Sequence, residues 1–214
     1  MIHFEKLGIF LSKPVAYLLM VIYLTQSCVL AYLVMDKYNL EQQIAFQQRR
    51  ISELEDKLQI LKAIGDFQIG FKDEEIRELT DVVYSESKKY QYDPMFILAM
   101  ILTESTFKSG EVSPMGARGL MQVAPITGQD VAPRAGVDWE GLSTLNQPVA
   151  NIKLGTAYLF EKILEFKDIK KALLAYNLGE TRLRTMLKAK EPLPSAYLNK
   201  VISNYRMLKE TYKA

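Results

Sequence analysis

The chain has 214 residues, enough for one compact domain with appended segments. Its 27 basic and 25 acidic residues give a formal net charge of +2, which provides no electrostatic basis for binding nucleic acid. The single cysteine (Cys28) and the single histidine (His3) both lie near the N-terminus, which excludes an intrachain disulfide and a histidine-based triad or zinc site in the rest of the chain.

The first pattern along the chain is an uncharged apolar run from Val15 to Met35. About 20 apolar residues in a helix cross a hydrocarbon core of about 30 Å, so residues 15–35 are predicted to span a membrane. Pro14 stands where a helix tolerates a missing N–H. Gln26, near the middle of the run, is expected to seek a hydrogen bond from a partner helix.

The charges that flank this run predict its orientation. Lys6 and Lys13 precede it, whereas Asp36 and Lys37 cancel. The positive-inside rule places residues 1–14 in the cytoplasm and the rest of the chain in the periplasm, which predicts a single-pass protein of the cytoplasmic (inner) membrane.

Two alternatives to an uncleaved anchor remain open. The run is also compatible with a signal peptide that is cleaved after the small residues Val29 and Ala31. Lipidation of Cys28 is the other alternative, although Thr25-Gln26-Ser27 departs from the usual sequence before a lipidated cysteine.

Residues 36–70 are predicted to form a helical stalk and a linker. The stalk is polar and lacks Pro and Gly up to Ile64, and its apolar residues recur at spacings of three and four, interrupted once by Gln47. These residues are Leu40, Ile44, Ile51, Leu54, Leu58 and Leu61. The pattern favours either a short coiled coil that pairs two copies or a lone helix that packs on its own domain. Gly65-Asp66 and Gly70 mark the linker, so removal of Met1–Gly65 is expected to leave activity intact.

Residues 71–214 are predicted to form an all-α domain. A helix is expected from Asp73 to about Tyr90, because acidic residues stabilise the first turn. Asp93 as N-cap and Pro94 at the first position begin the next helix, which is apolar on every face and runs to Glu104. This second helix is therefore expected to be central and buried.

The remaining segments alternate between irregular and helical patterns, and none alternates long enough to predict a strand. An irregular Gly/Pro-rich stretch is expected at Ser109–Gly119, followed by a short helix at Leu120–Gly128 and a second irregular stretch at Val131–Asn146. Three longer helices are then expected at Pro148–Phe166, Ile169–Ala189 and Ser195–Tyr212.

Glu104 is the strongest candidate for a catalytic residue. An acid at the C-terminal end of a fully apolar helix is partly desolvated and faces the negative end of the helix dipole, and both effects favour its protonated form. A carboxylic acid that is neutral near pH 7 is what a general acid for glycosidic cleavage requires. From position alone, a simple role as a water-exposed residue at the helix end is favoured over catalysis.

Four motifs in fixed order favour the catalytic interpretation. They are Glu104-Ser105, Ser113-Pro114-Met115-Gly116-Ala117-Arg118-Gly119-Leu120-Met121-Gln122, Asn151-Ile152-Lys153-Leu154-Gly155 with Tyr158-Leu159, and Ala175-Tyr176-Asn177. Together they resemble the SLT-type lytic transglycosylases, whose domain has a goose-lysozyme-like fold. The resemblance covers residues 71–205 and implies a lysozyme-like helical domain at residues 71–214.

The resemblance implies a role for each matching residue. Glu104 corresponds to the catalytic acid/base, and Tyr176 to a tyrosine that supports it. The residues implied to bind substrate are Ser105, Ser113, Gly119, Met121, Gln122, Asn151, Tyr176 and Asn177. Among them, Ser113 and Gln122 would hydrogen-bond sugar, and Asn151 and Asn177 would supply amides of the groove. Singly, each has an ordinary explanation as a cap, turn or core residue.

The sequence departs from the family pattern at two places. Ala124-Pro125 stands where members commonly have Met-Pro, and Leu178-Gly179-Glu180-Thr181 replaces the usual Ala-Gly-Pro-Gly. These differences affect the expected shape of the loops rather than the catalytic residue.

The function implied is cleavage of the MurNAc–GlcNAc β-1,4 bond of peptidoglycan glycan strands, with 1,6-anhydro-MurNAc ends. No acidic residue lies between Glu111 and Asp130, where a second carboxylate would face Glu104. One acid suffices if the C6 hydroxyl of the sugar is the nucleophile, so neither metal nor cofactor is expected. The alternatives are a lysozyme-like hydrolase and a non-catalytic peptidoglycan-binding scaffold of an envelope machine.

Overall fold

The structure, a computed structural model, describes residues 2–4, 9–108 and 110–212. Two three-residue strands lie at the N-terminus, where the sequence predicted none: β1 (Ile2–Phe4) pairs antiparallel with β2 (Ile9–Leu11). Lys6, on which part of the predicted orientation depends, and Ser109 lie outside the described residues.

The helix α1 (Lys13–Phe67) contains both the predicted membrane span and the predicted stalk without a break. The helix continues through Gly65 and Asp66, so the prediction that these residues begin the linker is wrong. Among the described residues, α1 is the one helix long and apolar enough to cross a membrane, with a mean hydropathy of 2.0 over its most apolar window. Contacts within the chain divide it into residues 1–53 and residues 54–214.

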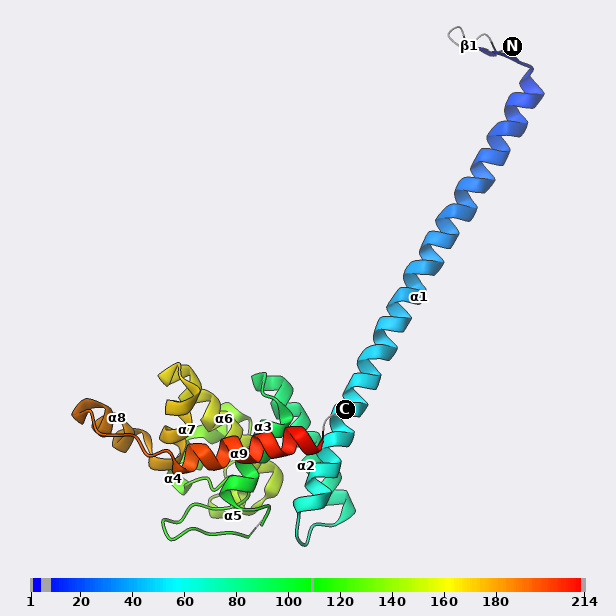
Figure 1. The fold of residues 1–214 in the computed structure, drawn as a ribbon. Coiled ribbons are helices and arrows are strands. Elements are labelled where there is room, and N and C mark those ends of the chain that lie inside the picture. Colours follow the sequence, from blue (N-terminus) through cyan, green and yellow to red (C-terminus); the bar gives the residue numbers. More distant parts are fainter. Residues whose placement is uncertain (1, 5–8, 109, 213–214) are drawn as a thin grey trace. The chain divides into compact units, whose positions relative to one another are not determined.

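Residues 54–214 form an all-helical domain, as predicted (Figure 1). The central helix α3 (Pro94–Glu104) packs against α2 (Asp73–Tyr90) and α9 (Ala196–Thr211). Helix α6 (Pro148–Phe166) packs against both α2 and α7 (Ile169–Leu178). The helix predicted from Pro148 to Phe166 is therefore confirmed at both ends.

The predicted start of α3 is also confirmed. The Asp93 carboxylate accepts a hydrogen bond of 2.9 Å from the backbone N–H of Met95, and Pro94 occupies the first turn. Seven residues of α3 are buried: Met95, Ile97, Leu98, Ala99, Met100, Ile101 and Thr103. Burial on all sides fixes the position of α3, and with it the position of Glu104 at its C-terminal end.

Three boundaries predicted from the sequence are wrong. The helix α4 (Pro125–Ala135) begins later than the predicted Leu120–Gly128 helix, because Gly119 and Gln122 both have positive φ, which helices exclude. The segment predicted to be irregular contains the end of α4 and the short α5 (Leu142–Asn146).

The third boundary lies at Gly179. Its φ of +83° divides the single helix predicted over residues 169–189 into α7 and α8 (Glu180–Ala189). Gly179 adopts this conformation without the penalty that a side chain would bring.

The last turns of α1 belong to the core of the domain. Ile60, Ala63 and Ile64 are at most 1% exposed, and the ring of Phe67 stacks on Phe107 at a centroid distance of 6.2 Å. Removal of Met1–Gly65 would therefore take away core residues, so the structure does not support the premise that this segment is separate from the domain. The apolar residues Leu54, Leu58 and Leu61, by contrast, remain exposed.

Candidate active site

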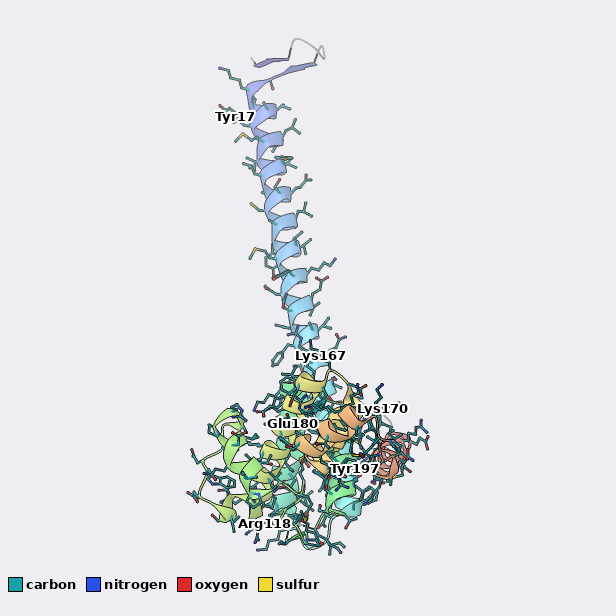
Figure 2. The ribbon with its side chains drawn as sticks, turned by 90° about the vertical axis from the view of Figure 1, so that its left-hand side faces the viewer. Tyr17, Arg118, Lys167, Lys170, Glu180 and Tyr197 are labelled. Atoms are coloured by element: carbon teal, nitrogen blue, oxygen red, sulfur yellow. The ribbon has the colours of Figure 1, made fainter. Side chains whose placement is uncertain are left out.

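Glu104 is partly buried at the C-terminal end of α3, where α9 provides its hydrogen-bond donor. The hydroxyl of Tyr197 donates to Oε1 of Glu104 at 2.5 Å. Burial raises the pKa of Glu104 to about 7, against smaller lowering effects of this hydrogen bond and of the Lys200 charge. Glu104 is therefore protonated in a large fraction of molecules near neutral pH, as a general acid requires. Figure 2 labels Tyr197 among the helices of the domain.

Helix α9 also holds the residue that precedes Glu104. Lys200 Nζ donates to the Thr103 carbonyl at 2.7 Å, and Asn204 Nδ2 donates to the Thr103 hydroxyl at 2.9 Å. Tyr197, Lys200 and Asn204 share one face of α9, since they follow one another at spacings of three and four. Sequence reasoning missed all three residues. The signal that could have found them is this polar stripe on a helix that otherwise packs on the core.

The loop that follows α3 is held together by hydrogen bonds between its side chains and its own backbone. The Ser113 hydroxyl accepts from the Ala117 N–H at 3.0 Å, and the amide nitrogen of Gln122 donates to the carbonyls of Glu111 and Gly119. Isolated bridges also pair Val112 with Arg118 and Arg118 with Val123. The predicted residues Ser113, Gly119 and Gln122 are thereby brought together in one compact loop.

Asn151 of α6 connects this loop to the domain. It is fully buried; its Oδ1 accepts from the Met121 N–H at 2.8 Å, and its Nδ2 donates to the carbonyls of Arg118 and Leu145 at 2.8 and 3.0 Å. Gly119, with a φ of +76°, fits against this side chain, because a Cβ there would lie 2.4 Å from Asn151 Nδ2. A side chain at position 119 would therefore displace Asn151 and the loop it holds.

Tyr176 of α7 joins the same arrangement from the other side. Its hydroxyl donates to the Met121 carbonyl at 2.7 Å. Burial, followed by the charge of Glu104, raises the pKa of Tyr176, which places this ring in the electrostatic environment of the acid. A Cβ on Gly155 would meet the Met121 side chain and the Tyr176 hydroxyl at 2.6 and 2.9 Å. The direct hydrogen bond to Glu104 comes from Tyr197, whereas Tyr176 supports the loop.

Three residues predicted to bind substrate are positioned otherwise. Asn151 and Met121 are fully buried, and the polar groups of the Asn151 side chain bond to the protein, so the structure gives both side chains a supporting position rather than an exposed one. Ser105 is 4% exposed, and its hydroxyl donates to the Ile101 carbonyl at 3.2 Å. These three buried residues support the backbone around the site. Asn177, in contrast, is exposed.

Within the described residues, no group of three or more His, Cys, Asp or Glu side chains is arranged to hold a metal ion. The arrangement offers one partly buried carboxylic acid with a pKa of about 7, which accepts a hydrogen bond from the Tyr197 hydroxyl. Tyr176, whose pKa burial and the charge of Glu104 raise, connects this environment to the loop at Met121. Such an arrangement on a helical domain has the features that acid/base chemistry requires.

Comparison with known proteins identifies the family. Residues 81–205, more than half of the chain, match the transglycosylase SLT domain, and the chain belongs to this family. The SLT70 soluble lytic transglycosylase of Escherichia coli has the same fold, with a TM-score of 0.55 at 23% identity over 62% of this chain and 24% of that chain.

Relatives with described activity are matched over part of their length. A transglycosylase of Enterobacteria phage PRD1 is 30% identical over 60% of this chain and 43% of its own length. The soluble lytic murein transglycosylase of Salmonella typhimurium is 35% identical over 43% of this chain and 15% of its own. The chain thus spans less than half the length of these two relatives.

Proposed function

We propose that this protein is a peptidoglycan lytic transglycosylase that cleaves the MurNAc–GlcNAc β-1,4 bond and leaves 1,6-anhydro-MurNAc ends. The observation that carries the proposal is the position of Glu104, partly buried at the end of α3 with the Tyr197 hydroxyl on its Oε1, where burial raises its pKa to about 7. The groups that act on this pKa are Tyr197 and Lys200, and neither is a carboxylate. The relatives named lytic murein transglycosylases support the same reaction.

The chemistry needs one group that first gives and then takes a proton. Protonated Glu104 donates its proton to the glycosidic oxygen as the bond breaks, which releases the GlcNAc end. The resulting carboxylate then takes the proton of the C6 hydroxyl while O6 bonds to C1, and Glu104 returns to its protonated state. The attack is intramolecular, so it has a high effective concentration and requires no second acid.

Tyr197 serves both steps from the same position. Its hydroxyl donates to Oε1, so the proton of the neutral acid is directed to Oε2, the oxygen left for the substrate. The same hydrogen bond becomes stronger when Glu104 is charged, which stabilises the carboxylate during ring closure. Ser113, Gln122 and Asn177 are the proposed contacts to sugar, since Ser113 and Gln122 shape the loop and Asn177 is exposed.

The lysozyme-like hydrolase and the non-catalytic scaffold remain the competing functions. A hydrolase needs a second group that activates water, whereas the side chains that act on the pKa of Glu104 are a tyrosine and a lysine. A scaffold needs no acid that titrates near neutrality.

Mass spectrometry of the products released from purified sacculi by the full-length chain in detergent tests the three functions. Wild type is expected to release anhydro-muropeptides, and Glu104→Gln at least about 10³-fold fewer. Glu191→Gln, which alters an exposed carboxyl, is the matched control and should behave as wild type. Reducing muropeptides from wild type would establish the hydrolase instead. Binding of sacculi without product would establish the scaffold.

The N-terminal region gives this activity a location. We propose that residues 15–35 anchor the chain in the inner membrane with residues 1–14 in the cytoplasm, and that the domain faces the periplasm. The support is the apolar first part of α1 and the two lysines before it. The stalk is the part of α1 that follows the anchor, and its last turns, from Ile60 onward, pack into the domain. The exposed stripe on the stalk also suggests a homodimer.

A further inference from the structure

The stalk carries two distinct apolar faces. Ile60, Ala63 and Ile64 are buried in the domain, whereas Leu54, Leu58 and Leu61 remain 57%, 51% and 37% exposed. At 100° per residue, these two sets lie on different sides of one helix. The exposed face is therefore not the one that packs on the domain, and a helix of a water-soluble segment does not leave such a row uncovered without a reason.

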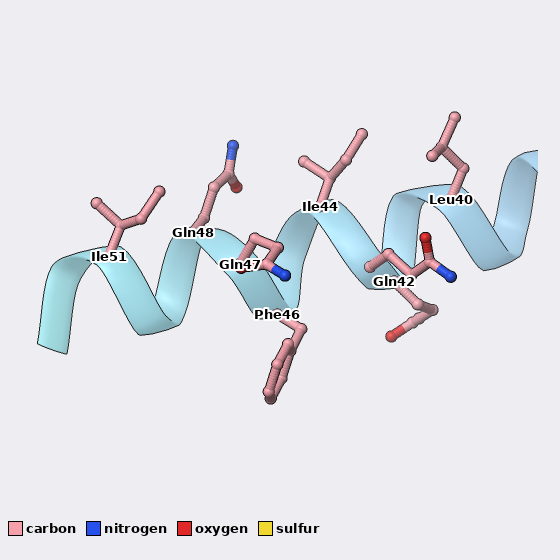
Figure 3. Close-up of a pocket in the computed structure, with 8 residues that line it drawn as sticks. Leu40, Gln42, Ile44, Phe46, Gln47, Gln48 and Ile51 are labelled. Atoms are coloured by element: carbon pink, nitrogen blue, oxygen red, sulfur yellow. The ribbon is translucent and has the colours of Figure 1, made fainter. Parts of the chain in front are cut away.

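The exposed face continues toward the N-terminus at the same spacing. Leu40, Ile44 and Ile51 are 55%, 48% and 54% exposed, and Figure 3 shows them projecting from the same side of α1, opposite to Phe46. From Leu40 to Leu61 the intervals alternate strictly between four and three residues when Gln47 is included. This is a heptad repeat, which is the pattern of a coiled coil rather than of a helix packed on a globular surface.

The residue types on the repeat identify the partner. The a positions hold Ile44, Ile51 and Leu58, and the d positions hold Leu40, Gln47, Leu54 and Leu61. Isoleucine at a with leucine at d favours a parallel coiled coil of two strands. A second copy of this chain presents the same residues at the same heights.

The same register continues into the apolar run. Three heptads before Gln47, it places Gln26 at a d position, in the middle of residues 15–35. Hydrophobic residues of this run do not indicate a register, because nearly every position is hydrophobic. The one amide in the run, Gln26, falls on the extended repeat. A glutamine inside a membrane is stabilised when its amide bonds to a partner helix.

Charges beside the repeat are mixed between two parallel copies, because one facing pair is opposite in sign and two are alike. Arg50 at g of one copy faces Glu55 at e of the other. Lys37, at an a position, is flanked by Asp36 of the other copy. Asp36 also faces Glu41 of the other copy, and this like-charge approach is relieved by Lys37, which lies 3.6 Å from Glu41 in its own chain. The second like-charged pair is Lys57 at g with Lys62 at e, so the pairing rests on the apolar repeat rather than on charge.

We propose that two copies of this protein pair in parallel and in register through one continuous repeat from Gln26 to Leu61, with Gln26 and Gln47 each bonded to its counterpart. The direction rests on the proposed membrane anchor, because two anchored chains enter the stalk from the same end. A slip of one heptad would place each glutamine against leucine, so the two amides set the register.

Disulfide cross-linking of the full-length chain in membranes tests the pairing, in a Cys28→Ser background. Leu40→Cys, at a d position, is expected to form a disulfide-linked dimer in most molecules under mild oxidation. Gln42→Cys is the matched control, since position 42 points away from the repeat, and at least tenfold less dimer is expected. Equal linking of both variants, or of neither, would overturn the dimer.

Mixed copies test the register. One copy carries Leu54→Cys and the other Leu61→Cys, with different tags. Matched pairs are expected to link, and the mixed 54–61 pair less than a tenth as much. When both copies also carry Gln26→Leu and Gln47→Leu, the amount of the disulfide-linked mixed 54–61 dimer should increase severalfold. Abundant mixed linking in the first experiment overturns the proposed register, and no increase in the second overturns the role of the glutamines. Neither readout depends on glycan cleavage, which is measured separately by muropeptide release.

Discussion

Residues 13–53 and residues 54–214 use apolar side chains in opposite ways. In the first region no described side chain is buried, and residues such as Tyr23 and Leu30 are 70% and 64% exposed. In the second, one core surrounds α3, with Leu98 and Met100 fully buried. The SLT domain is therefore stabilised by its own packing, whereas the N-terminal region is a helix whose apolar surface is suited to a membrane and a partner.

The boundary between the two regions gives the largest predicted effect on stability. A chain that starts at Phe71 lacks Ile60 and Ile64, and burial of each contributes about 1.5–3 kcal/mol. We expect its free energy of unfolding to be about 3–6 kcal/mol lower than that of a chain that starts at Leu54. Urea denaturation followed by circular dichroism measures the difference. Equal stability of the two chains would move the boundary of the domain to the end of α1.

A second prediction distinguishes Asn151, which supports the fold, from Asn177, which is proposed to contact sugar. Asn151→Ala leaves the Met121 N–H and the carbonyls of Arg118 and Leu145 without their partner, which should lower stability by about 2–5 kcal/mol. Asn177→Ala, at an exposed position, should change stability by less than about 0.5 kcal/mol but reduce the affinity for glycan. Thermal unfolding and sacculus binding of both variants give the result. Equal loss of stability in the two variants would show that Asn177, like Asn151, supports the fold.

The pH dependence of the free energy of unfolding should show that the pKa of Glu104 is raised in the folded domain. Burial raises its folded pKa to about 7 from an ordinary 4.5, so the folded state holds a proton that the unfolded state has released. The stability gained by this protonation is complete below pH 4.5 and is lost as the pH rises to about 7. Relative to Glu104→Gln, wild type should lose up to about 3 kcal/mol between pH 4.5 and pH 8. Parallel curves for the two proteins would exclude a raised pKa.

Tyr197→Phe gives the smallest predicted effect and concerns the proton itself. Loss of the hydroxyl should reduce kcat about tenfold, because the carboxylate formed in the first step loses its donor. Since this hydrogen bond lowers the pKa of Glu104, the loss of activity at high pH should move upward. Rates of muropeptide release between pH 5 and pH 9 measure both. Tyr212→Phe, which removes a hydroxyl bonded to Asp66, is the control. An unchanged pH profile in Tyr197→Phe would leave the tyrosine a packing role only.

The sequence determined the elements whose signals are local. The apolar run and the stripe of the stalk predicted the two halves of α1, and Asp93 with Pro94 predicted the start of α3. An apolar helix that ends in Glu104 also indicated a buried acid, because desolvation follows from the residues that precede it.

The tertiary structure decided what depends on residues far apart in the chain. The Glu104 hydrogen bond comes from Tyr197, 93 positions away. The polar stripe of α9 marks Tyr197 as a candidate, but it does not indicate which acid the hydroxyl contacts. The buried position of Asn151 likewise depends on the path of the loop at Met121. Local backbone preferences act within a few residues, whereas burial and hydrogen-bond pairing are set by which helices pack together.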